Sequence, residues 1–187
     1  MNLPNVLTIS RILFAIVLVF LLEERSLTGN ILAVIVFSIA SLTDFYDGHL
    51  ARTRGLVNNF GKIMDPIADK ILILSAFGVL AHIGIIAWWM FILIAFREIL
   101  VTFSRLGAMQ QGQVLAAERA GKIKTSVQII AVSVILLYLV AQRSEYCFSW
   151  FYNVQRIWLE VNYCLMLAAV ILTVYSGIDY FRHKYSH

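Results

Sequence analysis

Four aspartates form two close pairs between residues 44 and 69. Asp44 and Asp47 are three residues apart, and Asp65 and Asp69 are four residues apart. On a helix, which turns by about 100° per residue, each spacing places both carboxylates of a pair on one face. Carboxylate oxygens are the hard ligands that Mg²⁺ and similar divalent cations prefer. The spacing therefore predicts a divalent-metal site built from two helix segments.

Small residues and one arginine accompany the first aspartate pair. Gly48 and Ala51 fall on the same helix face as Asp44 and Asp47, within an arc of about 100°, and Arg52 follows them. Side chains this small leave the backbone open to close approach by a flat or phosphorylated ligand. A guanidinium group offers a forked set of donors to phosphate oxygens. The segment therefore favours a phosphorylated ligand beside the metal site.

A proline marks the start of the helix that carries the second aspartate pair. Asp65 followed by Pro66 is typical of an N-cap residue and a proline at the first helical position. We therefore expect the helix to begin at Asp65. Gly61 is then expected to lie in the entry segment that precedes the helix.

The composition identifies the chain as an integral membrane protein. Hydrophobic residues make up 60% of its 187 residues and charged residues only 14%, against about 45–50% and about 25% in soluble domains. A single soluble core could not bury so much apolar surface, which excludes a disordered chain, a disulfide-rich secreted scaffold and an ordinary soluble enzyme. The formal net charge of +4 indicates membrane orientation and contact with anionic lipids, and no nucleic-acid partner is expected.

Six segments are long and apolar enough for transmembrane helices, which need roughly 20 mainly apolar residues. These segments are residues 6–22, 30–50, 66–84, 86–107, 125–141 and 157–179. The connections between them are short. We therefore expect an all-α integral membrane protein in which residues 1–187 form one domain.

The distribution of Lys and Arg predicts the orientation. With the N-terminus in the cytoplasm, most of the 15 Lys and Arg residues fall at cytoplasmic ends, and the outer ends hold Arg25, Arg143 and Arg156. The positive-inside rule then places both termini in the cytoplasm, in a multi-pass protein of the cytoplasmic (inner) membrane. In this orientation the second helix ends, and the third begins, at the cytoplasmic face. All four aspartates are therefore expected at one membrane depth, facing the cytoplasm.

The pattern D-x2-D-G-x2-A-R-x8-G-x3-D-x3-D at residues 44–69 resembles the signature of the CDP-alcohol phosphotransferases. The resemblance implies six transmembrane helices and a homodimer. It also implies that a substituted phosphate moves from a CDP-linked donor to an alcohol, with release of CMP.

The same resemblance implies roles for the residues of the motif. Two metal ions, Mg²⁺ or Mn²⁺, would be held by Asp44, Asp47, Asp65 and Asp69. Asp69 would also act as the catalytic base on the acceptor hydroxyl. The cytidine diphosphate part of the donor would be held by Gly48, Ala51, Arg52 and Gly61.

Motifs outside this pattern indicate the acceptor. Residues 97–105, residues 121–125 with Gln128, and the opening and closing segments 5–11 and 176–180 resemble the branch of the family that uses CDP-diacylglycerol and sn-glycerol 3-phosphate. Cations at the cytoplasmic ends of the expected fourth and fifth helices agree with a phosphorylated acceptor. The residues expected to bind its phosphate are Arg105, Arg119, Lys122 and Lys124.

Alternatives remain for these cations and for the acceptor. The positive-inside rule and contact with anionic lipids would by themselves also explain why these cations lie at the cytoplasmic ends. Serine, inositol phosphate or phosphatidylglycerol as acceptor is a second hypothesis with the same chemistry. A divalent-cation carrier is a third, although carrier sites lie near the membrane midplane and these acids collect at one face.

Three further predictions concern reactive side chains. Arg97 lies inside the expected fourth span, where a charged group needs a partner, so we expect it to pair with Glu98 or with an aspartate. Cys147 and Cys164 lack CxxC spacing and are expected to be buried as small hydrophobic residues. No Ser/His/Asp or Cys/His set falls at one depth on one side of the membrane, so we expect no nucleophilic triad and no covalent intermediate.

Overall fold

The structure is a computed structural model, and it describes the backbone of residues 3–54, 59–110, 119–144 and 148–185. Side chains are described for residues 9–43, 67–68, 70–108, 121–144 and 154–182. Over these backbone ranges the chain forms helices and no strand. The helices are α1 (Leu3–Glu23), α2 (Leu27–Arg54), α3 (Asn59–His82), α4 (Trp88–Gln110), α5 (Arg119–Arg143) and α6 (Phe148–Tyr185).

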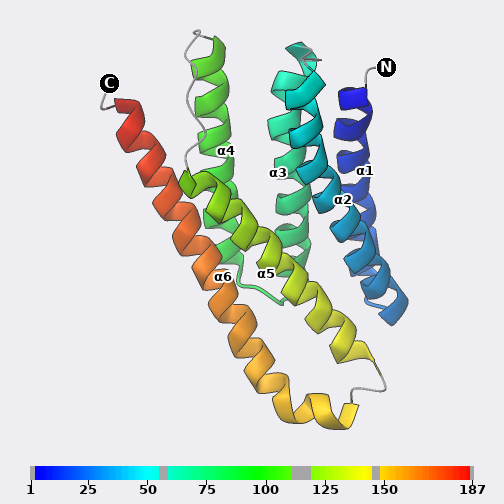
Figure 1. The fold of residues 1–187 in the computed structure, drawn as a ribbon. Coiled ribbons are helices and arrows are strands. Elements are labelled where there is room, and N and C mark those ends of the chain that lie inside the picture. Colours follow the sequence, from blue (N-terminus) through cyan, green and yellow to red (C-terminus); the bar gives the residue numbers. More distant parts are fainter. Residues whose placement is uncertain (1–2, 55–58, 111–118, 145–147, 186–187) are drawn as a thin grey trace.

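The helices run alternately up and down in one bundle (Figure 1). α1 packs against α2 and α3, α4 packs against α3 and α6, and α5 lies against α2, α3 and α6. The start of α1, the end of α2, the start of α3 and the end of α6 lie at the same end of the bundle. Each segment expected to span the membrane corresponds to one helix, so the all-α fold with six helices is confirmed.

The described helices are apolar outside and polar at several positions inside. Phe20, Phe96 and Phe103 are 71%, 65% and 70% exposed, which is expected of side chains that face lipid. Two stretches, Gly121–Arg143 and Val154–Arg182, are long and apolar enough to cross a membrane among the residues described. Where side chains are described, the buried polar ones are Arg11, Asn30, Glu98, Lys124, Gln128, Asn162, Thr173 and Ser176.

The start of α3 differs from the prediction. The helix begins at Asn59, so Gly61, Asp65 and Pro66 all lie inside it. The prediction that Asp65 caps the helix, with Gly61 before it, is therefore wrong. A proline inside a helix loses one backbone hydrogen bond and crowds the carbonyl of the residue four positions earlier, at a cost of about 3 kcal/mol. The helical hydrogen bonds on both sides of Pro66 offset this cost. The helix therefore continues through Pro66.

Cys164 also differs from the prediction. It is exposed on α6, as are its neighbours Val161 and Tyr163, so its expected burial is wrong. A lipid-facing helix surface accepts the same apolar side chains as the protein interior, because lipid tails are as apolar as the core. Hydrophobic character alone therefore does not separate the two positions. Cys147 lies outside the described residues.

Candidate active site

The predicted carboxylate set lies on two helix segments at one end of the bundle. Asp44 and Asp47 belong to α2, and Asp65 and Asp69 belong to α3. Four residues join the two helices, so the last Cα of α2 and the first Cα of α3 are at most about 19 Å apart. Figure 1 shows these helix ends beside the start of α1, at the same end of the bundle as the end of α6. The four side chains themselves lie outside the described residues.

The residues expected to hold cytidine diphosphate share the same segments. Gly48, Ala51 and Arg52 lie on the last turns of α2, and Gly61 lies on the first turn of α3. The positions of their side chains also fall outside the described residues. Four carboxylates on two connected helix segments are the oxygen-rich donor set that Mg²⁺ or Mn²⁺ prefers, so the residues present fit divalent metal ions.

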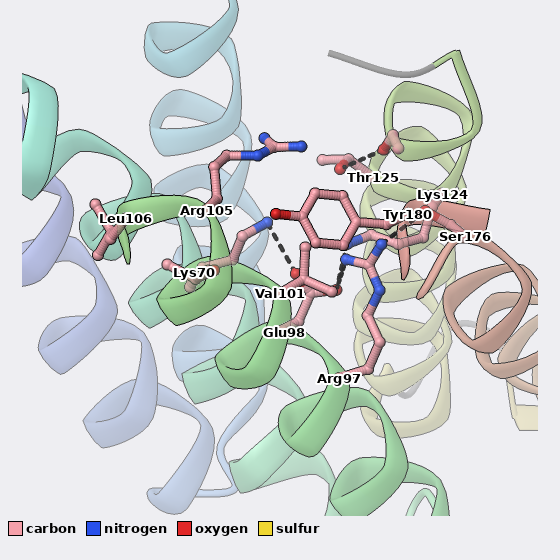
Figure 2. A pocket seen from close by; sticks show the side chains of 12 residues that line it. Lys70, Arg97, Glu98, Val101, Arg105, Leu106, Lys124, Thr125, Ser176 and Tyr180 are labelled. Atoms are coloured by element: carbon pink, nitrogen blue, oxygen red, sulfur yellow. Dashed lines mark hydrogen bonds and ion pairs between the residues drawn. The ribbon is translucent and has the colours of Figure 1, made fainter. Parts of the chain in front are cut away.

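A polar cavity of about 120 Å³ opens among α3, α4, α5 and α6 (Figure 2). Its polar lining includes hydroxyl groups from Thr102, Thr125, Ser176 and Tyr180. Among the residues whose side chains are described, its charged residues are four cations and one carboxylate: Lys70, Arg97, Arg105, Lys124 and Glu98. Because cations outnumber the carboxylate, the cavity suits an anionic ligand such as a phosphate ester.

Glu98 is the centre of this charge cluster. Lys70 Nζ lies 2.9 Å from Glu98 Oε2, and Lys124 Nζ donates to Glu98 Oε1. Arg97 Nη1 lies 3.6 Å from Oε1, which confirms the expected pairing of Arg97 with Glu98. Gln128 Nε2 donates to the same oxygen at 3.4 Å. The Glu98 carboxylate, which is only 1% exposed, therefore has partners on α3, α4 and α5.

Hydrogen bonds extend this cluster to α6. Arg97 Nη2 donates to Ser176 Oγ at 2.7 Å, and Gln128 Nε2 donates to Thr173 Oγ1 at 3.0 Å. Gly177 allows Arg97 to lie this close, because a Cβ at that position would be 3.1 Å from Arg97 Cγ. The polar contacts therefore hold all four helices that surround the cavity.

Arg105 lies apart from the Glu98 ion pairs. Its guanidinium carbon is 5.8 Å from the centroid of the Tyr180 ring, within the range of a cation–π contact. Figure 2 shows the guanidinium reaching across the cavity from α4. Its charge is therefore not neutralised by the Glu98 carboxylate, and a ligand in the cavity can contact the guanidinium group.

The four cations expected to bind the acceptor phosphate occupy different positions. Arg105 and Lys124 line the cavity, and Lys124 is also buried against Glu98. Lys122 is exposed on the first turn of α5 and is not part of the cavity lining. The side chain of Arg119, the first residue of α5, lies outside the described residues.

Lys70 is a site residue that sequence reasoning missed. In the orientation argument it is only one of the Lys and Arg residues at the cytoplasmic ends, although it lines the cavity and pairs with Glu98. A signal was present, because Lys70 falls inside the expected span 66–84, where a charged side chain needs a partner. The identity of that partner depends on how α3 packs against α4.

Sequence comparisons agree with this architecture. The profile of the CDP-alcohol phosphatidyltransferase family matches residues 1–175. The CDP-diacylglycerol--glycerol-3-phosphate 3-phosphatidyltransferase of Bacillus subtilis (strain 168) is 38% identical, over 98% of this chain and 95% of that protein. A probable phosphatidylglycerophosphate synthase of Mycobacterium tuberculosis is 38% identical, over 96% of this chain and 79% of that protein. A CDP-diacylglycerol--glycerol-3-phosphate 3-phosphatidyltransferase of Rickettsia typhi is 32% identical, over 97% and 96%.

The family match covers the helices that carry the aspartates and those that surround the cavity. It includes all of α1 to α5 and most of α6. Members of this family are integral membrane enzymes that generally use divalent metal ions, in agreement with the apolar outer surface and with the carboxylate set. The chain therefore belongs to the CDP-alcohol phosphatidyltransferase family.

Proposed function

We propose that this enzyme transfers the phosphatidyl group of CDP-diacylglycerol to sn-glycerol 3-phosphate, giving phosphatidylglycerophosphate and CMP. The observation that carries the proposal is the cation-rich cavity, which includes α3, the helix of Asp65 and Asp69. A phosphorylated acceptor needs such a cavity, whereas a neutral or zwitterionic acceptor does not. The names of the B. subtilis and M. tuberculosis relatives support the same reaction.

The acceptor phosphate is proposed to bind in the cavity among Lys70, Arg105 and Lys124, which line it. Each cation can donate a charge-assisted hydrogen bond to a phosphate oxygen. The volume of about 120 Å³ favours a small acceptor over a second phospholipid. Arg119 and Lys122, at the start of α5, are proposed to raise the positive potential that attracts the acceptor.

The donor is proposed to bind at the ends of α2 and α3. Gly48, Ala51, Arg52 and Gly61 are assigned to its cytidine diphosphate part. The aspartates Asp44, Asp47, Asp65 and Asp69 are assigned to two ions, Mg²⁺ or Mn²⁺. When bound, such ions neutralise charge on the attacking and leaving oxygens of the displacement.

The proposed reaction is a single displacement at phosphorus. The acceptor hydroxyl oxygen forms a bond to the phosphatidyl phosphorus while the bond from that phosphorus to the bridging oxygen of the diphosphate breaks. CMP leaves with the bridging oxygen and its electron pair. Asp69 accepts the hydroxyl proton as general base. No residue of the protein becomes covalently attached to the lipid.

The proposal includes a location and an assembly. The enzyme is proposed to be a homodimer of single-domain chains in the cytoplasmic (inner) membrane, with both termini in the cytoplasm. The excess of Lys and Arg at that end of the bundle supports the orientation. A cytoplasmic site also gives the water-soluble acceptor and CMP a direct path to and from the cavity.

The function can be tested with the purified protein in detergent. CMP release from CDP-diacylglycerol is measured with sn-glycerol 3-phosphate, serine, inositol phosphate or phosphatidylglycerol, and the lipid product is identified by mass spectrometry. We expect Mg²⁺-dependent CMP release and phosphatidylglycerophosphate with sn-glycerol 3-phosphate alone. Release that depends on another acceptor, and not on sn-glycerol 3-phosphate, would overturn the assignment.

A further inference from the structure

The geometry points to a role for Glu98 that goes beyond neutralising charge: we infer that it is a positioning residue for the acceptor. Its carboxylate holds Lys70 and Lys124 in the cavity where the acceptor phosphate is proposed to bind. The inference rests on the proposed function, because it concerns the binding of that phosphate.

The first step of the argument is that the two carboxylate oxygens serve different helices. Oε2 lies 2.9 Å from Lys70 Nζ on α3, and Oε1 accepts from Lys124 Nζ on α5. Glu98 itself belongs to α4. A lysine ammonium sits on a flexible four-carbon stem and has no fixed position of its own. One carboxylate therefore sets the positions of two ammonium groups from two other helices.

The second step concerns exposure. The side chains of Glu98 and Lys124 are 1% and 2% exposed, whereas that of Lys70 is 28% exposed. Lys124 and Glu98 thus form the buried part of the cluster, while the side chain of Lys70 is partly exposed. Lys70 is therefore the partner of Glu98 that is best placed to meet a ligand from the cavity.

The third step concerns the place of Lys70 on α3. Lys70 directly follows Asp69, one of the proposed metal ligands and the proposed base. An ion pair that holds Lys70 against α4 also limits rotation of α3 about its axis in this turn. Glu98 therefore connects the acceptor cavity to the helix segment that carries the carboxylate set.

Positioning and simple electrostatics predict opposite effects when the carboxylate is removed. Four cations and one carboxylate line the cavity among the described side chains, and removing the charge of Glu98 makes the cavity more positive. If only the electrostatic potential of the cavity mattered, the acceptor phosphate would then bind more tightly. Under the positioning role, Lys70 and Lys124 lose their shared partner and repel each other, so phosphate binds more weakly in a more positive cavity.

The variant Glu98→Gln tests this difference, because glutamine keeps the shape and removes the charge. We expect the KM for sn-glycerol 3-phosphate to rise about tenfold or more, which is the effect of one charge-assisted contact. The KM for CDP-diacylglycerol should change less than about twofold on the same reasoning. Glu98→Asp, which keeps the charge, should recover most of the loss. The control Glu160→Gln alters an exposed carboxylate on α6 and should behave as the wild type.

Glu98→Gln leaves a buried ammonium group without its carboxylate, which destabilises the fold. A second pair of variants keeps the test valid if Glu98→Gln does not fold. Lys124→Met removes that ammonium group. The double variant Glu98→Gln/Lys124→Met is then compared with the single variant Lys124→Met. We expect the double variant to have a higher KM for sn-glycerol 3-phosphate than Lys124→Met alone, because Lys70 has lost its partner. Equal values would overturn the positioning role.

The remaining outcomes are also decisive. A lower or unchanged KM for sn-glycerol 3-phosphate in a folded Glu98→Gln variant would overturn the inference and favour a purely electrostatic role. A loss of kcat in Glu98→Gln with the KM values for both substrates unchanged would also overturn the inference. Failure of the proposed function is distinguishable, because the wild-type enzyme would then release no CMP in response to sn-glycerol 3-phosphate.

Discussion

Lys70 Nζ lies 2.9 Å from Glu98 Oε2, so the residue that follows Asp69 on α3 is tied to the buried face of α4. The same carboxylate accepts a hydrogen bond from Lys124 on α5. A buried ion pair of this kind costs desolvation energy, and it is tolerated best when further partners surround the charges. Here the partners of Glu98 come from α3, α4 and α5, and Arg97 and Gln128 connect them by hydrogen bonds to α6, which gives the charged residues a defined arrangement.

The carboxylate set is expected to be essential together with divalent metal. EDTA should abolish CMP release, and Mg²⁺ or Mn²⁺ should restore it. Asp44→Asn or Asp65→Asn should lower kcat by on the order of 100-fold or more, since altering even the outer partners of a metal site costs about 10–100-fold. Glu160→Gln, an exposed carboxylate on α6, is the matched control. Near-normal turnover of a folded aspartate variant would exclude the two-metal site.

Arg105 is expected to bind the acceptor. Arg105→Ala should raise the KM for sn-glycerol 3-phosphate about 10- to 150-fold, because a charge-assisted hydrogen bond contributes roughly 1.5–3 kcal/mol. The KM for CDP-diacylglycerol should change much less. Lys122→Ala should have a smaller effect, because Lys122 does not line the cavity. Both substrates are titrated separately, with Arg156→Ala, at an exposed position on α6, as the control.

An unchanged acceptor KM in Arg105→Ala and in Lys122→Ala would have a clear meaning. These cations would then serve membrane orientation only, as the positive-inside rule allows. The choice of acceptor would have to depend on other residues of the cavity.

Transfer is expected to be direct, so the configuration at the phosphatidyl phosphorus should invert. The test uses CDP-diacylglycerol made chiral at that phosphorus with oxygen isotopes or sulfur, followed by stereochemical analysis of the product. A single displacement inverts the phosphorus, whereas two successive displacements through a lipid–enzyme intermediate retain its configuration. Retention, or a trapped lipid–enzyme adduct, would contradict the proposed reaction.

A larger side chain in place of Gly177 is expected to lower the stability of the fold. In Gly177→Ala the new Cβ would be 3.1 Å from Arg97 Cγ, so Arg97 must move and its hydrogen bond to Ser176 weakens. Overpacking of this kind costs about 1–3 kcal/mol, which corresponds to a fall in Tm of roughly 2–12 °C for a chain of this size.

The control for this substitution is Gly107→Ala. A Cβ at Gly107 meets no atom within 4 Å, and alanine is the better helix former, so Tm should stay the same or rise. Thermal unfolding of both variants is measured in the same detergent. A Tm of Gly177→Ala equal to that of Gly107→Ala would show that Arg97 accommodates the methyl group freely.

The helices could be predicted closely because their signal is local and strong. Runs of apolar residues about 20 long are bounded by charged or polar residues, and each run corresponds to one observed helix. The start of α3 was missed because Pro66 is a frequent first residue of a helix but not an obligatory one. Cys164 was missed because a lipid-facing position and a buried one both accept an apolar side chain.

The sequence by itself determined the parts of the site that depend on spacing within one helix. Asp44 with Asp47, and Asp65 with Asp69, share a face through helical periodicity alone, and the alternating direction of the helices brings the pairs to one end. Only the tertiary structure decided the cavity. Lys124 meets Glu98 across 26 residues, and Arg97 meets Ser176 across 79. Such pairs depend on how each helix is rotated against its neighbours, and that rotation is set by packing over the whole bundle.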